Sequence, residues 1–243
     1  IGDIFSAILS QTKLHITVVK GYDLPKTVDK NSLVVITSVS GNTAEALSIL
    51  DQTKYLECNL IAVSSGGKIE KICNENKIEY RKIKEHNSPR ASLVSFIYSM
   101  LKILKFIIPI KEEDIIESIK NLKQLENGIS SNNLTKSNEA LNLAKEISGI
   151  PLIYYPWGLQ AAGIRFKNSL QENAKMHAMV EDVVETSHNG IVAWEKKSEV
   201  LPILLQGDDD NIKTKERWQV LKIYFNENII EYKEIISIKG NIL

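Results

Sequence analysis

The sequence predicts an α/β fold built from doubly wound parallel sheets. Three observations predict it: short strand-like runs that are apolar throughout, helical segments between them, and a return of the same alternation late in the chain. Strands with apolar side chains on both faces are typical of parallel sheets that helices cover on both sides. A length of 243 residues allows one large domain or two smaller ones. The repeated alternation favours two similar halves.

The first half contains four candidate strands with helices between several of them. We expect the strands at residues 14–19, 32–37, 59–63 and 78–83, and the helices at residues 44–55 and 68–76. This part, residues 1–110, is the predicted first subdomain.

The middle of the chain is predicted to be helical. Residues 91–108 and 112–126 carry apolar side chains three and four positions apart, and residues 138–147 form another helical segment. The polar cluster at residues 127–133 is the best candidate for a linker. We expect residues 111–149 to connect the two halves.

The second half, residues 150–243, resumes the alternation. We expect strands at residues 151–155, 176–180, 200–206 and 232–238, and helices at residues 159–175 and 214–224. Three aspartates at residues 208–210 lie in a predicted loop. They suit a solvated turn better than a cation site, because no further ligands are spaced around them.

Composition excludes several classes of protein. The chain has 30 basic and 30 acidic residues, so it lacks the broad basic field of a nucleic-acid-binding protein. The longest apolar stretch, residues 93–110, carries Lys102 and Lys105, which favours a buried helix over a membrane span. Cys58 and Cys73 have no metal-site spacing and indicate reduced thiols in a cytoplasmic protein. We expect no metal ion.

The most specific local feature is a hydroxyl-rich loop at residues 37–45, between an apolar strand and a helix. Ligands of open α/β sheets bind at this edge, and a helix start offers N–H groups and a partial positive charge. Ser38, Ser40 and Thr43 would add hydroxyl donors. Because the loop has no lysine or arginine, it suits one phosphate monoester better than a polyphosphate. The alternative is a plain turn with Asn42 or Ser40 capping the helix.

A second loop, residues 64–68, looks like half of a nucleotide-binding loop. It lacks the upstream glycine, and Ile69 follows Lys68 where such loops carry serine or threonine. We therefore expect no nucleotide there, and we expect this loop to flank the same edge of the sheet.

Four segments together resemble a known family. Residues 38–45, with the sequence SVSGNTAE, look like the sugar-phosphate signature of the SIS (sugar isomerase) family. With PRASL at residues 89–93, QENAK at 171–175 and SHNG at 187–190, the order resembles the bifunctional phosphoglucose/phosphomannose isomerases of archaea and some bacteria. The resemblance covers roughly residues 1–240 and implies two SIS subdomains. It also implies interconversion of aldose and ketose 6-phosphates without a metal or other cofactor.

The sequence departs from that family at both ends. The family has a glycine- and serine-rich phosphate loop before the segment that matches residues 1–4, and a further helical segment with a lysine after residue 239. The chain begins with Ile1 and stops at Leu243. We therefore expect it to be part of a longer protein.

The resemblance implies three catalytic residues. Glu172 is expected to be the base that moves a proton between C1 and C2 through a cis-enediol, which a carboxylate can do. His188 would open the sugar ring, and the resemblance implies that it reaches the active site of the partner subunit in a homodimer. Arg90 would stabilise the enediolate oxygens by paired hydrogen bonds. Ser38, Ser40 and Thr43 would hold the substrate phosphate. Without the resemblance, Glu172, His188 and Arg90 would pass for ordinary surface side chains.

The resulting hypothesis is a cytoplasmic, homodimeric enzyme of carbohydrate metabolism that interconverts fructose 6-phosphate with glucose 6-phosphate and mannose 6-phosphate. Its partner is a small sugar phosphate, with no nucleic acid or membrane involved. One alternative is a non-catalytic SIS module that binds a sugar phosphate and regulates transcription or another domain; the pair Glu172 and His188 argues against it. Another is an isomerase for a pentulose or heptose phosphate, although those relatives usually have one SIS domain.

Overall fold

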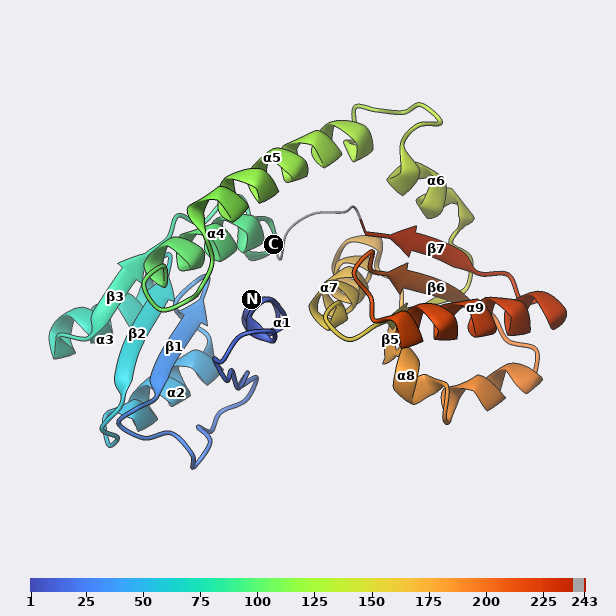
Figure 1. Cartoon of the computed structure of the whole chain (residues 1–243). Helices are drawn as coiled ribbons and strands as arrows, with labels where there is room; N and C mark the ends of the chain where they lie inside the picture. Colours follow the sequence, from blue (N-terminus) through green and yellow to red (C-terminus); the bar gives the residue numbers. More distant parts are fainter. Residues whose placement is uncertain (238–242) are drawn as a thin grey trace. The chain divides into compact units, whose positions relative to one another are not determined.

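The computed structural model describes residues 1–237 and residue 243, and it divides into two compact units, Ile1–Ile110 and Lys111–Leu243 (Figure 1). Each unit contains its own parallel sheet. This confirms the predicted α/β class.

Among the described residues, unit 1 holds a three-stranded sheet in the order β1-β2-β3, with both strand pairs parallel. Its strands are β1 (Leu33–Ser38), β2 (Asn59–Ser64) and β3 (Glu79–Lys82). The connections are made by α2 (Ala44–Thr53) and α3 (Gly67–Asn76). These elements match the predicted ones closely.

The core of unit 1 forms where α2 and α3 pack on the sheet. Ile36 and Ala62 from the strands meet Leu50 of α2 and Ile69 and Cys73 of α3, and all five are buried. Burying an isoleucine or leucine side chain, such as that of Ile36 or Leu50, stabilises the fold by about 1.5–3 kcal/mol. The remaining helices of this unit are α1 (Gly2–Leu9), the 3₁₀ turn η1 (Pro89–Ser92) and α4 (Leu93–Ile103).

Unit 2 contains, in its described part, a four-stranded parallel sheet in the order β5-β4-β6-β7. The strands are β4 (Ile150–Tyr155), β5 (Met179–Asp182), β6 (Val200–Gln206) and β7 (Lys233–Ile236). The helices and turns are α5 (Glu112–Ile129), α6 (Glu139–Glu146), α7 (Gln160–Ser169), η2 (Leu170–Ala174), α8 (Val183–Thr186), η3 (Gly190–Glu195) and α9 (Ile212–Glu227). Its core combines aliphatic side chains with the buried rings of Tyr154, Trp218 and Phe225. The ring of Trp194 meets that of Phe225 edge-on, with 5.5 Å between the ring centroids.

Several predicted elements were wrong in type or extent. Residues 14–19 form no strand; Leu14 and Val19 are exposed, and without a neighbouring strand their β propensity has no ladder to join. The predicted linker at residues 127–133 begins too early, because α5 continues to Ile129. The single helix expected over residues 159–175 changes after Ser169 into the π-helical turn η2.

Smaller shifts affect three other predictions. The strand expected at residues 176–180 lies slightly later, as β5, and the helix expected at 91–108 starts as η1 and ends at Ile103. The last predicted strand is β7, and Ile238 of its predicted range lies outside the described residues.

The aspartates at residues 208–210 form a turn, in which Asp210 accepts hydrogen bonds from the Gly207 amide and the Trp218 indole. Over the part of the chain that the structure describes, no helix has the length and apolar character to cross a bilayer.

Candidate active site

The loop after β1 is organised around Ser38, the last residue of that strand. Its buried Oγ accepts hydrogen bonds from the Gly41 amide and from the Thr43 hydroxyl, both at 3.0 Å. A serine oxygen offers two acceptor positions and one hydrogen. Because both acceptor positions are used, the hydrogen of Ser38 remains available to a ligand oxygen.

The start of α2 is open to an anion. Its N-cap residue is Thr43, which makes no capping hydrogen bond with its side chain because its hydroxyl turns to Ser38. The alternative, a plain turn in which Asn42 or Ser40 caps the helix, is therefore not the arrangement found. The Asn42 side chain bonds the Ser40 carbonyl and the Lys68 amide. The first-turn amides of α2 keep the partial positive charge that favours a phosphate.

The start of α3 differs, because the first loop already uses its amides. The Lys68 amide donates to Asn42 Oδ1, and the Ile69 amide donates to the Gly41 carbonyl, each at 3.0 Å. The Ser65 amide also donates to the Val39 carbonyl at 2.9 Å. The second loop thus lies against the first, as expected. Of the two helix starts, only that of α2 suits a ligand.

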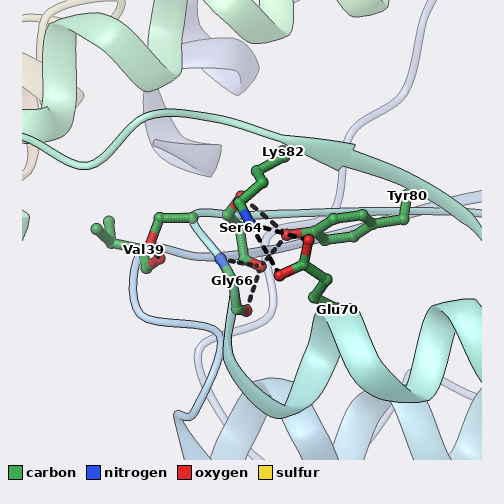
Figure 2. A network of polar contacts seen from close by, with 7 residues as sticks. Val39, Ser64, Gly66, Glu70, Tyr80 and Lys82 are labelled. Atoms are coloured by element: carbon green, nitrogen blue, oxygen red, sulfur yellow. Dashed lines mark hydrogen bonds and ion pairs between the residues drawn. The ribbon is translucent and has the colours of Figure 1, made fainter.

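Close approach of the two loops depends on glycine. Gly41 has a φ of +68°, and a Cβ on it would lie 1.8 Å from the Gly66 carbonyl oxygen. Figure 2 shows the network behind this contact, with Ser64 at its centre. The Ser64 hydroxyl lies 2.8 Å from the Gly66 carbonyl and 3.0 Å from the Tyr80 hydroxyl. Beside them Lys82 pairs with Glu70, which raises the pKa of Lys82.

Glu172 lies in η2, the π-helical turn that follows α7. The turn ends at Lys175, whose backbone has the left-handed conformation with a φ of +58°. The Lys175 ammonium donates a hydrogen bond to the Glu172 carbonyl. The Glu172 side chain is exposed in this chain. Single π-helical turns occur frequently at functional sites. Apolar periodicity gave no signal for this turn, because the residues fit an ordinary helix equally well.

His188 lies just after the short helix α8. Asp182 caps α8 by accepting from the Val184 and Glu185 amides. The His188 amide donates to the Glu185 carbonyl at 3.0 Å, so the loop continues directly from this helix. The imidazole is exposed.

Arg90 lies in η1, the 3₁₀ turn that begins at Pro89. Ser88 caps this turn by accepting from the Ala91 amide, and Ser92 donates to the Ser88 carbonyl at 2.9 Å. The Arg90 side chain is exposed. The serines therefore hold the turn, and Arg90 lies at the surface of unit 1.

The topology of unit 2 separates Glu172 from His188. The chain runs from the carboxyl end of β4 through α7 and η2 to the start of β5, and the two strands are parallel. Glu172 therefore lies near the amino-terminal edge of the sheet. His188 follows α8, which begins at the carboxyl end of β5. Within one chain these two residues lie toward opposite edges of the same sheet.

Other sources of reactive groups are sparse in the described residues. Among them no cluster of three or more histidine, cysteine, aspartate or glutamate side chains is arranged to hold a metal ion. Both cysteines are free thiols, and burial raises the pKa of Cys58 and of Cys73. Neither thiol has the lowered pKa of a nucleophilic cysteine.

Comparison with known proteins gives a consistent result. Residues 136–243 match the family described as bacterial phospho-glucose isomerase C-terminal SIS domain. A bifunctional phosphoglucose/phosphomannose isomerase of Caldicellulosiruptor bescii is 28% identical, over 96% of this chain and 71% of that protein. A D-glucosamine-6-phosphate 4-epimerase of Sulfolobus acidocaldarius is 27% identical, over 74% of this chain and 58% of that protein.

The fold has solved counterparts. The tagatose-6-phosphate ketose/aldose isomerase of Escherichia coli matches with a TM-score of 0.68 and 14% identity, over 100% of this chain and 72% of that one. At this identity the match concerns the fold alone. Residues 136–243 thus match the family of bacterial phospho-glucose isomerase C-terminal SIS domains, and the chain is similar over most of its length to bifunctional phosphoglucose/phosphomannose isomerases.

Proposed function

We propose that this protein is a sugar-phosphate isomerase that interconverts fructose 6-phosphate with glucose 6-phosphate and with mannose 6-phosphate. The observation that carries the proposal is the loop after β1. There Ser38 accepts two hydrogen bonds and keeps its own hydrogen for a ligand, beside a helix start that no side chain caps. That arrangement supports binding of one phosphate group. The relatives named phosphoglucose/phosphomannose isomerase support a six-carbon substrate.

In this proposal each residue has one task. Ser38, Ser40 and Thr43 hold the phosphate, which takes no part in the chemistry. Glu172 removes a proton from C1 of the ketose while O2 is protonated, which gives the cis-enediol; it then returns the proton to C2 while O1 loses its hydroxyl proton and becomes the aldehyde oxygen.

Two further groups assist this transfer. His188 exchanges the ring-opening proton, since an imidazole can both donate and accept near neutral pH. The Arg90 guanidinium faces the negative charge that develops on the enediolate oxygens. No metal ion or cofactor is assigned a task.

The proposal includes a homodimer in which His188 serves the partner's active site. Its support is the position of Glu172 and His188 toward opposite edges of one sheet. A two-fold axis could bring the histidine of one subunit to the glutamate of the other, because such an interface is reciprocal. The free thiols of Cys58 and Cys73 suit a reducing compartment, so we also propose that the protein is cytoplasmic and acts in glycolysis or gluconeogenesis.

A coupled assay with fructose 6-phosphate tests the activity. We expect both glucose 6-phosphate and mannose 6-phosphate to form; formation of neither would overturn the proposal. A protein that binds fructose 6-phosphate without turnover would instead be the regulatory module. The Glu172→Gln variant should lose about 10²- to 10⁴-fold in kcat. Glu126→Gln, an exposed position on α5, is the matched control and should keep full activity.

Subunit mixing tests the shared site. Glu172→Gln and His188→Ala variants are each inactive alone in this proposal. After random exchange, half of the dimers are mixed, and each has one site with both residues intact, so about one quarter of wild-type activity should return. If both residues act within one chain, mixing restores nothing, and the shared site is wrong.

A further inference from the structure

The geometry points to Asn42 as a positioning residue. We propose that its side chain keeps the phosphate loop in its binding shape by joining it to the second loop. The inference rests on the proposed function only in taking the ligand to be a sugar phosphate. Asn42 would touch neither the phosphate nor the reacting carbons.

Both ends of the Asn42 amide are used. Nδ2 donates to the Ser40 carbonyl at 3.1 Å, and Oδ1 accepts from the Lys68 amide at 3.0 Å. The Asn42 backbone amide also donates to Ser40 Oγ at 3.3 Å. One exposed side chain therefore fixes the phosphate loop and the start of α3 at the same time.

The second loop fits closely beneath this bridge. Gly67 has a φ of +76°, and a Cβ on it would lie 2.4 Å from the Ser40 carbonyl oxygen and 2.9 Å from the amide atoms of Asn42. The loop is itself fixed from behind, since the Gly66 amide donates to Ser64 Oγ and Ser64 contacts the Tyr80 hydroxyl (Figure 2). The phosphate loop thus rests on a support that is tied to β3.

The bridge holds the Ser40 carbonyl, and so the backbone that carries the Ser40 hydroxyl. Ser40 Oγ accepts from the Asn42 backbone amide, so with the loop held in this shape its hydrogen can point to a ligand. A binding loop that is already ordered does not lose entropy when the ligand arrives, which increases affinity. Loss of Asn42 should therefore weaken phosphate binding without removing any donor to the phosphate.

The kinetic signature of such a role is specific. The phosphate group is the same in the substrate and in the transition state, so weaker binding of it lowers both affinities equally. That change raises KM and leaves kcat unaltered. A residue that only stabilises the fold would change the melting temperature and neither kinetic constant.

The experiment compares Asn42→Ala with Asn76→Ala in the protein. Asn76 lies at the end of α3 in the same unit, is exposed, and donates to the Ile72 carbonyl at 2.8 Å. For Asn42→Ala we expect KM for fructose 6-phosphate and the inhibition constant of inorganic phosphate to rise together by about three- to tenfold, with kcat within twofold. Asn76→Ala should alter none of these constants.

A second variant covers the case in which Asn42→Ala is poorly folded. Tyr80→Phe removes the hydroxyl that contacts Ser64 and should raise both constants in the same ratio, by a smaller factor. Unchanged constants in correctly folded Asn42→Ala, or a fall in kcat alone, would overturn the inference. If the wild type has no isomerase activity, the proposed function fails by itself. The inference is then decided by whether inorganic phosphate raises the melting temperature of the wild type more than that of Asn42→Ala; equal shifts, or none, would refute it.

Discussion

Replacement of Gly41 by alanine is the most direct test of the two-loop architecture. The new Cβ would meet two obstacles: a backbone φ of +68°, and the Gly66 carbonyl oxygen at 1.8 Å. The left-handed conformation costs a non-glycine residue about 1–2 kcal/mol. Overpacking against a rigid neighbour costs about 1–3 kcal/mol more, and here the neighbour is backbone. The free energy of unfolding of unit 1 should therefore fall by about 2–5 kcal/mol.

Scanning calorimetry measures this loss, and two other glycines separate its causes. At about 2–4 °C per kcal/mol for a chain of this size, Gly41→Ala should lower the melting temperature by roughly 4–20 °C. Gly158 has a φ of +96° with no atom near its Cβ position, so Gly158→Ala should show the conformational cost alone. Gly21 has neither obstacle, and Gly21→Ala should be nearly neutral. A Gly41→Ala protein that melts within a degree of the wild type would show that the two loops do not pack as described.

Three further predictions concern other positions. Ser38→Ala removes a hydroxyl from the proposed phosphate site and leaves the Gly41 amide without its acceptor. In steady-state kinetics, KM for fructose 6-phosphate should therefore rise about tenfold or more. An unchanged KM would exclude Ser38 from the site. Gly149→Ala, with a φ of +68° and the Glu199 carbonyl at 1.8 Å, should destabilise unit 2 as Gly41→Ala does unit 1, and calorimetry would detect it. Burial raises the pKa of Tyr154 to about 12, above its ordinary value of 10.0, so the folded state holds this proton more tightly than the unfolded state. The stability from this group is therefore complete below pH 10 and is lost as pH rises toward 12; urea unfolding should show a loss of about 2–3 kcal/mol that Tyr154→Phe abolishes.

Much of the fold follows from local pattern. The strands β1 and β2 are mostly apolar and become buried toward their carboxyl ends, and each ends in small polar residues beside a helix start, so the sequence locates them within a residue or two. The segment at residues 14–19 has the same composition and forms no strand. A strand requires a neighbour as well as a propensity, and the pairing of distant segments is not written in either segment alone.

The candidate site shows the same division. The hydroxyl-rich loop and its place at the end of β1 could be predicted, because residue type and neighbouring elements suffice. The path of the Asn42 side chain could not be predicted, because its oxygen accepts a hydrogen bond from the Lys68 amide. Lys68 comes near Asn42 only after β2 has paired with β1. The π-helical turn around Glu172 was also missed, since one extra residue in a helical turn does not disturb the apolar spacing before it.

The strand orders of the two sheets have a consequence for how the chain folds. In unit 1 the order β1-β2-β3 follows the sequence, so each strand can join the edge left by the strand synthesised just before it. In unit 2, β4 pairs with β5 on one side and must keep its other side open until β6 arrives. Domains generally fold as units from the N-terminus during synthesis, and long-range pairing slows folding. Unit 1 can therefore fold while unit 2 is still emerging from the ribosome. Until β6 arrives, one edge of β4 has no strand beside it and can pair with the strand of another chain.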